Sequence, residues 1–141
     1  NNTKDVPHDY IEIEKPFTAR YLKIQNIKMP TGKFAISGLR VFGNGSGEKP
    51  QKVEIFVVLR NPKEKAGERR SSWLKWKQNN LADGYVIYFG KSPDKMYGSI
   101  MVYGKNDYYF TGMDAADTYY FKIEAFNNNG ISEKTEIAKV E

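Results

Sequence analysis

The sequence predicts an all-β protein, a sandwich of antiparallel strands, and two observations lead to this fold class. First, residues 119–126 alternate in character, so that Tyr119, Phe121, Ile123 and Ala125 share the one buried face of a long strand. Second, short runs of β-branched and aromatic residues recur at intervals of about 8–12 residues, with turn-forming residues between them. No stretch shows a convincing helical pattern, so a sandwich is the expected fold.

About seven strands are expected in the C-terminal part of the chain. In the second of them, Leu74 and Trp76 are expected to face the core, whereas Trp73 points to the opposite face. In the last strand, Ile137 is the clearest apolar residue, and the Asn-Asn-Asn-Gly sequence at 127–130 predicts a tight hairpin before it. The expected strands cover residues 53–59, 72–76, 85–89, 99–103, 107–111, 119–127 and 135–140.

The residues around the long strand resemble the EF loop and F strand of a fibronectin type III domain. In that family a leucine precedes a tight turn, and a tyrosine then locks the corner through a hydroxyl bonded to backbone upstream. Met113 stands at the leucine position and Tyr119 at the tyrosine position, while Ala115-Ala116 replaces the usual Pro-Gly of the turn. The resemblance implies an immunoglobulin-like (fibronectin type III) seven-strand sandwich. Its further signature positions, expected in the core, are Trp76, Tyr85, Ile123 and Ala125.

Three more strands are expected before this domain, at residues 10–14, 19–27 and 34–42. The segments ARYLKI and FAISGLRVFG, with Arg20 and Tyr21 in the first, resemble the closing strands of a discoidin-type (coagulation factor type C-like) jelly roll, a galactose-binding-like sandwich. The ligand loops of that family lie in the part of the module that the resemblance does not cover. No ligand residue is therefore transferred from it.

These resemblances divide the chain into the end of a truncated discoidin-type sandwich at 1–46, a linker at 47–51 and a fibronectin type III-like domain at 52–141. Strands cut from a sandwich expose apolar faces and unpaired edges. We expect the apolar side chains of the first segment to pack against the type III unit or to pair with a second copy of the chain, as a dimer. These side chains are Ile11, Ile13, Leu22, Ile24 and Val41.

Composition and charge argue against catalysis, metal binding and nucleic-acid binding. The chain has no cysteine, which excludes disulfides, thiol catalysis and the usual zinc sites, and its one histidine, His8, lies in a polar N-terminal tail. The net charge of +5 is mostly scattered, and the densest basic patch, at 63–70, is expected to be a solvated loop. No run of about 18 apolar residues is present for membrane insertion. We therefore expect no catalytic residue, no cofactor and no metal.

Exposed aromatic side chains are the candidates for ligand binding, because sugars dock their apolar face on flat rings. Trp73 is the first candidate, since strand alternation places it opposite the core residue Trp76. The alternative is that such rings form cross-strand pairs on the surface or pack on a neighbouring module. The further candidates are Tyr88, Tyr97, Tyr103 and Tyr109.

The turn GKSPDKMY followed by SIMVY, with AFNNNGIS near the end, resembles C-terminal modules of family 43-like glycoside hydrolases of Bacteroides-type bacteria. Those enzymes are β-xylosidases and arabinofuranosidases, and nothing in this chain resembles their catalytic propeller. The resemblance implies a non-catalytic accessory or spacer module of an enzyme that is secreted, periplasmic or on the outer cell surface. Its implied partners are the catalytic domain of the parent chain and a plant polysaccharide such as xylan or arabinoxylan. An adhesion or protein–protein interaction module of a cell-surface protein is the alternative.

Overall fold

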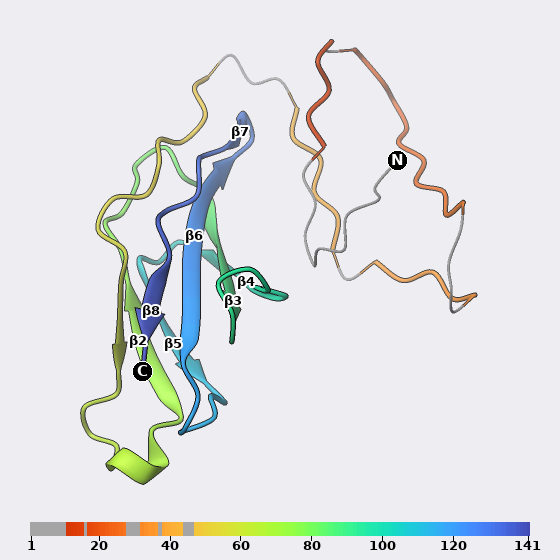
Figure 1. The fold of residues 1–141 in the computed structure, drawn as a ribbon. Helices are drawn as coiled ribbons and strands as arrows, with labels where there is room; N and C mark the ends of the chain where they lie inside the picture. Colours follow the sequence, from red (N-terminus) through yellow and green to blue (C-terminus); the bar gives the residue numbers. More distant parts are fainter. Residues whose placement is uncertain (1–10, 16, 28–31, 37, 44–46) are drawn as a thin grey trace.

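The strands of the computed structural model form two antiparallel sheets that face each other (Figure 1). The structure describes residues 11–15, 17–27, 32–36, 38–43 and 47–141. The smaller sheet has three strands in the order β1-β2-β5, and these are β1 (Val57–Arg60), β2 (Ser71–Lys75) and β5 (Asp107–Thr111). The predicted all-β sandwich is thus confirmed.

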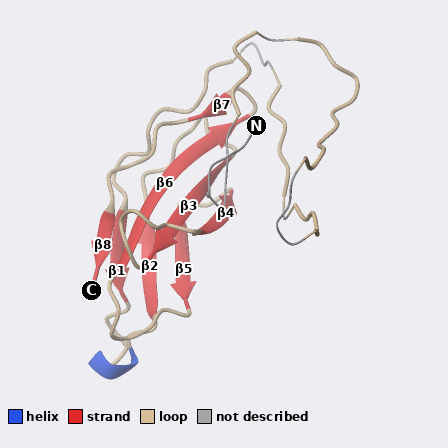
Figure 2. Cartoon of the chain, turned by 45° about the vertical axis from the view of Figure 1, so that its right-hand side comes forward, coloured by secondary structure: helices blue, strands red, loops and turns tan. Residues whose placement is uncertain are grey.

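The larger sheet has five strands, and β6 lies at its centre. The order is β4-β3-β6, and the two short strands β7 and β8 both pair with β6, on the side away from β3. A short 3₁₀ turn, η1 (Ala66–Glu68), connects β1 to β2 and lies at the end of the sandwich away from β7 (Figure 2). The strands are β3 (Gly84–Gly90), β4 (Gly98–Tyr103), β6 (Tyr119–Asn127), β7 (Gly130–Ile131) and β8 (Ala138–Val140).

The main core lies between the two sheets, and the alternating face of β6 is its centre. Tyr119, Phe121, Ile123 and Ala125 are all buried, as their period-two spacing predicts. The smaller sheet contributes Leu74, which is fully buried against them. Trp76 and Tyr85, which the resemblance places in the core, are buried with Trp76 packed edge-on against Tyr85, the ring centroids 5.1 Å apart.

The corner before β6 forms as the resemblance implies. The backbone N–H of Asp114 donates to the hydroxyl oxygen of Tyr119 at 3.1 Å, which closes the corner upstream of the strand. The N–H of Asp117 donates to the carbonyl of Asp114 at 3.3 Å, so the turn closes over Ala115-Ala116 without a Pro-Gly pair. Met113 is fully buried beneath this turn.

The opposite face of β6 is also covered, which the alternation pattern did not predict. We call this second group of buried side chains the outer cluster; it lies on the face of the larger sheet turned away from the main core. It consists of Val86, Tyr88, Met96 and Phe126. The expectation of a strand buried on one face only is therefore wrong for β6, because loops and the preceding chain cover its second face.

Two of the predicted strands begin at least three residues later than expected, and the other shared boundaries agree to within one residue. The first strand begins at Val57 rather than at residue 53, because Ile55 has a positive φ of 51° and interrupts the extended chain. The last strand begins at Ala138, and its core residue is Val140, whereas Ile137 is 45% exposed. Before it, Thr135 bonds to both backbone groups of Ile123 with its N–H and its hydroxyl, so this stretch is tied to β6 without a regular ladder.

The three strands predicted before the sandwich are not found among the described residues of 11–43. The five apolar side chains named above are not buried against the sandwich either: they are exposed, from 43% at Ile24 to 72% at Ile11. Isolated strands need neighbours to complete their hydrogen bonds, and the described residues form no further sheet for them. Pairing with a second copy stays a prediction, and residues 1–10, 16, 28–31, 37 and 44–46 lie outside the described part.

Candidate ligand-binding face

The candidate site lies on the outer face of the smaller sheet, where Trp73 stands on its central strand. Trp73 is opposite Leu59 on β1 and Tyr109 on β5 in the strand register, so the three side chains form one row across the sheet. Its indole is 39% exposed and lies 4.5 Å from the ring of Tyr109, centroid to centroid, at an interplanar angle of 41°. Alternation alone predicts this exposure, because Leu74 on the same strand is fully buried.

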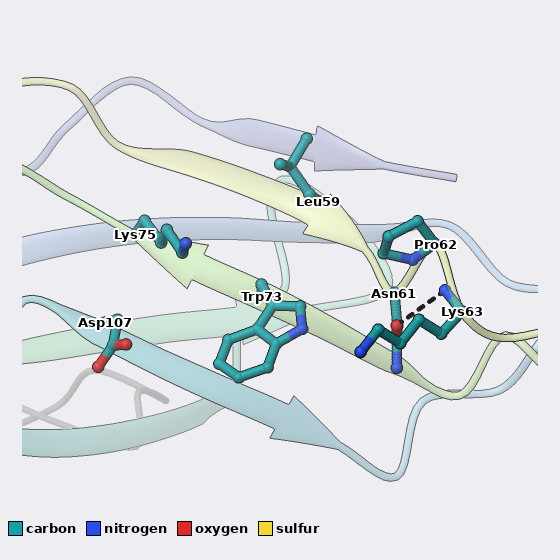
Figure 3. Close-up of a pocket in the computed structure, with 7 residues that line it drawn as sticks. All are labelled: Leu59, Asn61, Pro62, Lys63, Trp73, Lys75 and Asp107. Carbon is teal, nitrogen blue, oxygen red and sulfur yellow. Dashed lines mark hydrogen bonds between the residues drawn. The ribbon is translucent and has the colours of Figure 1, made fainter.

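An open depression of about 440 Å³ surrounds the indole (Figure 3). Figure 3 shows the indole lying along the sheet between β2 and β5, with Leu59 on one side and Asp107 on the other. Apolar surface therefore lies next to charged and amide groups. The lining residues are Leu59, Asn61, Pro62, Lys63, Trp73, Lys75 and Asp107.

A hydrogen-bond network fixes the tyrosine that stacks on Trp73. The amide of Asn61 donates to the hydroxyl oxygen of Tyr109 at 2.9 Å, and that hydroxyl also lies 2.6 Å from the hydroxyl of Ser71. The carbonyl oxygen of Asn61 in turn accepts from the backbone N–H of Lys63 at 3.0 Å, which orders the start of the loop after β1. The aromatic pair is thus held in place before any ligand arrives, which lowers the entropy lost on binding.

This arrangement suits a flat ligand with one apolar face and hydroxyls at its edge. The indole offers the flat ring, and the amide, ammonium and carboxylate groups around it are of the kinds that orient polar groups of a ligand. The described residues contain no group of three or more His, Asp or Glu side chains arranged to hold a metal ion. Sequence reasoning missed Asn61 and Lys63, whose part in the site depends on the register that brings the end of β1 beside Tyr109.

The other predicted aromatic residues do not join this face. Tyr97 and Tyr103 are exposed, but Tyr103 belongs to β4 of the larger sheet, and Tyr97 directly precedes that strand. Tyr103 packs edge-on against the buried ring of Phe126, with 5.5 Å between ring centroids, and so lies at the edge of the outer cluster.

The prediction that Tyr88 is an exposed ring available to a ligand is wrong. Its side chain lies in the outer cluster and is only 8% exposed. Its hydroxyl donates to the buried carboxylate of Glu124 at 2.6 Å, and the ammonium of Lys134 lies 4.5 Å from the ring centroid. Tyr88 is on β3, which is hydrogen-bonded on both edges and covered on both faces. No sugar ring can lie flat on a side chain in this environment.

Alkaline pH is expected to reveal the burial of Tyr88. Burial of the ring and, after it, the hydrogen bond to Glu124 raise the pKa of Tyr88 well above its ordinary value. Above about pH 10 the unfolded chain loses this proton whereas the folded chain keeps it, so the free energy of unfolding falls as the pH rises. In Tyr88→Phe the slope of unfolding free energy against pH between pH 10 and 11.5 should be shallower by up to about one proton per chain.

Urea unfolding at several alkaline pH values measures this slope. Tyr97→Phe is the matched substitution, since it removes one phenol hydroxyl from a ring that is 55% exposed. Equal slopes in the unaltered chain and in Tyr88→Phe would contradict the raised pKa.

No protein-family model and no curated protein matches the chain. Solved structures do match it. FN3tt is 25% identical with a TM-score of 0.54, and the match covers 67% of this chain and 95% of that one. An Fn3-like protein from Clostridium thermocellum is 16% identical with a TM-score of 0.51, covering 69% and 94%. The FN1–FN3 domains of chicken CNTN1 are 14% identical with a TM-score of 0.54, covering 65% and 32%.

The C-terminal part of the chain has the immunoglobulin-like sandwich fold of fibronectin type III domains, and these likenesses support a fibronectin type III-like module. Such a module is a general unit for binding or spacing in multidomain proteins, and its fold is typically non-catalytic. The described residues include no helix long and apolar enough to cross a membrane.

Proposed function

We propose that the chain is a non-catalytic accessory and spacer module of a secreted, polysaccharide-degrading glycoside hydrolase, and that the face around Trp73 assists carbohydrate binding. The observation that carries this proposal is the pre-ordered pair of Trp73 and Tyr109 beside an open depression. The hydrolase parentage, with its secreted, periplasmic or outer-surface location, comes from the sequence resemblance to modules of xylosidases and arabinofuranosidases. The partners are the parent catalytic domain and a plant polysaccharide of the xylan or arabinoxylan class.

The chemistry of the depression supports a sugar rather than a nucleic acid. A pyranose or furanose ring has C–H bonds on one face, which pack on an indole, and hydroxyls at its edge. Asp107 and Lys75 lie opposite each other in the strand register, so an acceptor and a donor for hydroxyls flank the indole. The mixture of charges disfavours a phosphate backbone, which is bound by basic groups.

The affinity should be modest, because one aromatic platform in an open depression covers only one side of a sugar. We expect a dissociation constant of about 1 mM for a xylo- or arabinoxylo-oligosaccharide, or roughly −4 kcal/mol. Such weak binding suits an accessory role, since a covalently attached catalytic domain gains from the raised local concentration of substrate.

An NMR titration of the chain with xylo- and arabinoxylo-oligosaccharides tests the proposal. Amide shifts should change around residues 59–63, 73–75 and 107–109, and they should saturate. Trp73→Ala should weaken binding at least about tenfold, whereas Tyr97→Ala, the loss of an exposed ring that does not line the depression, should leave it unchanged. Tryptophan fluorescence gives a second readout, since Trp76, the other indole of the chain, is buried in the core.

Shifts that stay constant at every accessible oligosaccharide concentration would contradict carbohydrate binding at this face and leave the spacer role alone. Saturable binding that Trp73→Ala does not weaken would place the sugar elsewhere on the module. Capture of a defined protein through the Trp73 face, unaffected by glycans, would favour the adhesion or protein-interaction alternative.

A further inference from the structure

A segment that precedes the sandwich lies against the outer cluster of the larger sheet. The guanidinium carbon of Arg40 is 4.4 Å from the ring centroid of Tyr103 and 4.4 Å from that of Phe126. The ring of Phe42 packs edge-on against Phe126, with 6.3 Å between centroids. These are the contacts of a cation over two aromatic faces and of an aromatic pair, and both favour one relative orientation of the groups.

Phe126 owes its burial to this cover as well as to its own sheet. Its ring lies over Gly84, its cross-strand partner, where an added Cβ would come within 2.6 Å of the ring. Tyr103 of β4 also packs against the ring from the same sheet. Phe42 and Arg40 contact it from the preceding segment, and the side chain of Phe126 is 1% exposed.

Residues 47–50, which precede the first strand, also contact the sandwich. The amide of Asn127 donates to the carbonyl of Glu48 at 2.8 Å and to that of Leu81 at 2.9 Å, and the amide of Asn129 donates to the same Glu48 carbonyl at 3.3 Å. The chain passes so close to the β6–β7 hairpin that a Cβ at Gly47 would lie 2.8 Å from the amide nitrogen of Asn129. Pro50 is buried after it.

The sequence of residues 44–50, by contrast, has the glycine- and serine-rich composition of a flexible linker. Chains rich in glycine and serine behave as flexible coils. Here the bonds from Asn127 and Asn129 hold its end, and the contacts of Arg40 and Phe42 hold the chain that leads into it.

We propose that the outer cluster is the docking face for residues 38–43, with Arg40 and Phe42 as its anchors, and that it fixes the preceding part of the chain at one angle to the sandwich. The chain that enters the sandwich is then held on the larger sheet by Arg40 and Phe42. This inference is independent of carbohydrate binding, since it concerns the larger sheet, whereas Trp73 lies on the smaller one.

Limited trypsin digestion of residues 1–141, followed by mass spectrometry, tests the docking. Trypsin cuts after Arg20, which is exposed, and after Arg40, whose guanidinium lies over the rings of Tyr103 and Phe126. Cleavage of a docked segment must wait for local opening, so we expect the cut after Arg40 to be at least about tenfold slower than that after Arg20. Phe42→Ala should speed the Arg40 cut about tenfold, whereas Phe34→Ala, the loss of an exposed ring, should not.

Two further measurements separate loss of docking from loss of folding. Cleavage after Lys122, within β6, reports whether the sandwich of each variant is folded. In the unaltered chain, the ¹⁵N heteronuclear NOE of the Val41 and Phe42 amides should equal that of β3, which needs no variant. Equal cleavage rates after Arg20 and Arg40, or NOE values for residues 41–42 well below those of β3, would overturn the proposal. Neither result bears on the oligosaccharide titration, so failure of the two proposals can be told apart.

Discussion

Replacing Phe121 with alanine is expected to lower the free energy of unfolding by about 3–5 kcal/mol. Phe121 is fully buried at the middle of β6, and its ring packs edge-on against Phe110 with 5.3 Å between centroids. Phe89 and Tyr119 adjoin it on other sides. The alanine would leave a cavity between two sheets that are hydrogen-bonded within themselves, so they cannot close on it freely. A domain of this size has about 5–15 kcal/mol of stability in all.

Urea unfolding followed by Trp76 fluorescence measures this loss, since Trp76 lies in the same core. Phe121→Leu should lose less than half as much, because leucine fills most of the volume. Leu59→Ala on the outer face is the surface control and should stay within about 0.5 kcal/mol. A change below about 1.5 kcal/mol in Phe121→Ala would contradict a tightly packed core at this point.

The centre of the fold was predictable because one strand carries a long and regular alternation. Period-two spacing from Tyr119 to Ala125 identifies which side chains point the same way, and the tyrosine corner depends on residues close in sequence. Alternation does not say whether the second face meets solvent. The cover of Phe126 and Tyr88 comes partly from loops and from residues before the sandwich, and contacts over such sequence distances leave no local pattern.

The candidate site was predictable in part for the same reason. Alternation places Trp73 outward once Leu74 is assigned to the core, but it cannot say which aromatic lies beside it. That depends on register, which pairs Trp73 with Tyr109 and leaves Tyr103 on the other sheet. The strands expected before residue 43 were predicted but are not found among the described residues. Apolar alternation is present there, but a strand needs a neighbour to pair with, and propensity alone does not supply one.

Arg60 is a buried charge that no sequence pattern singled out. It ends β1, and its guanidinium donates to the carbonyl of Arg69 at 2.6 Å and to that of Asp117 at 2.5 Å. It also lies over the ring of Tyr119, 5.9 Å from its centroid. One side chain thus ties the loop after β1 to the turn before β6. Burial and, second to it, the charge of Arg69 lower the pKa of the guanidinium, which shows that the site is partly desolvated.

Arg60→Ala is expected to lower the free energy of unfolding by about 2–4 kcal/mol, because two carbonyls lose a charged donor and the corner loses packing. Arg60→Lys keeps the charge but cannot donate in the planar fork that reaches both carbonyls, so it should recover no more than about half of the loss.

Tyr119→Phe, in the same unfolding experiment, measures the contribution of the tyrosine hydroxyl separately from that of the guanidinium. It removes only the hydroxyl that accepts from Asp114 and should cost about 1 kcal/mol. If Arg60→Ala costs no more than Tyr119→Phe, the guanidinium does not hold the corner together, and the hydroxyl and its backbone bond account for its stability.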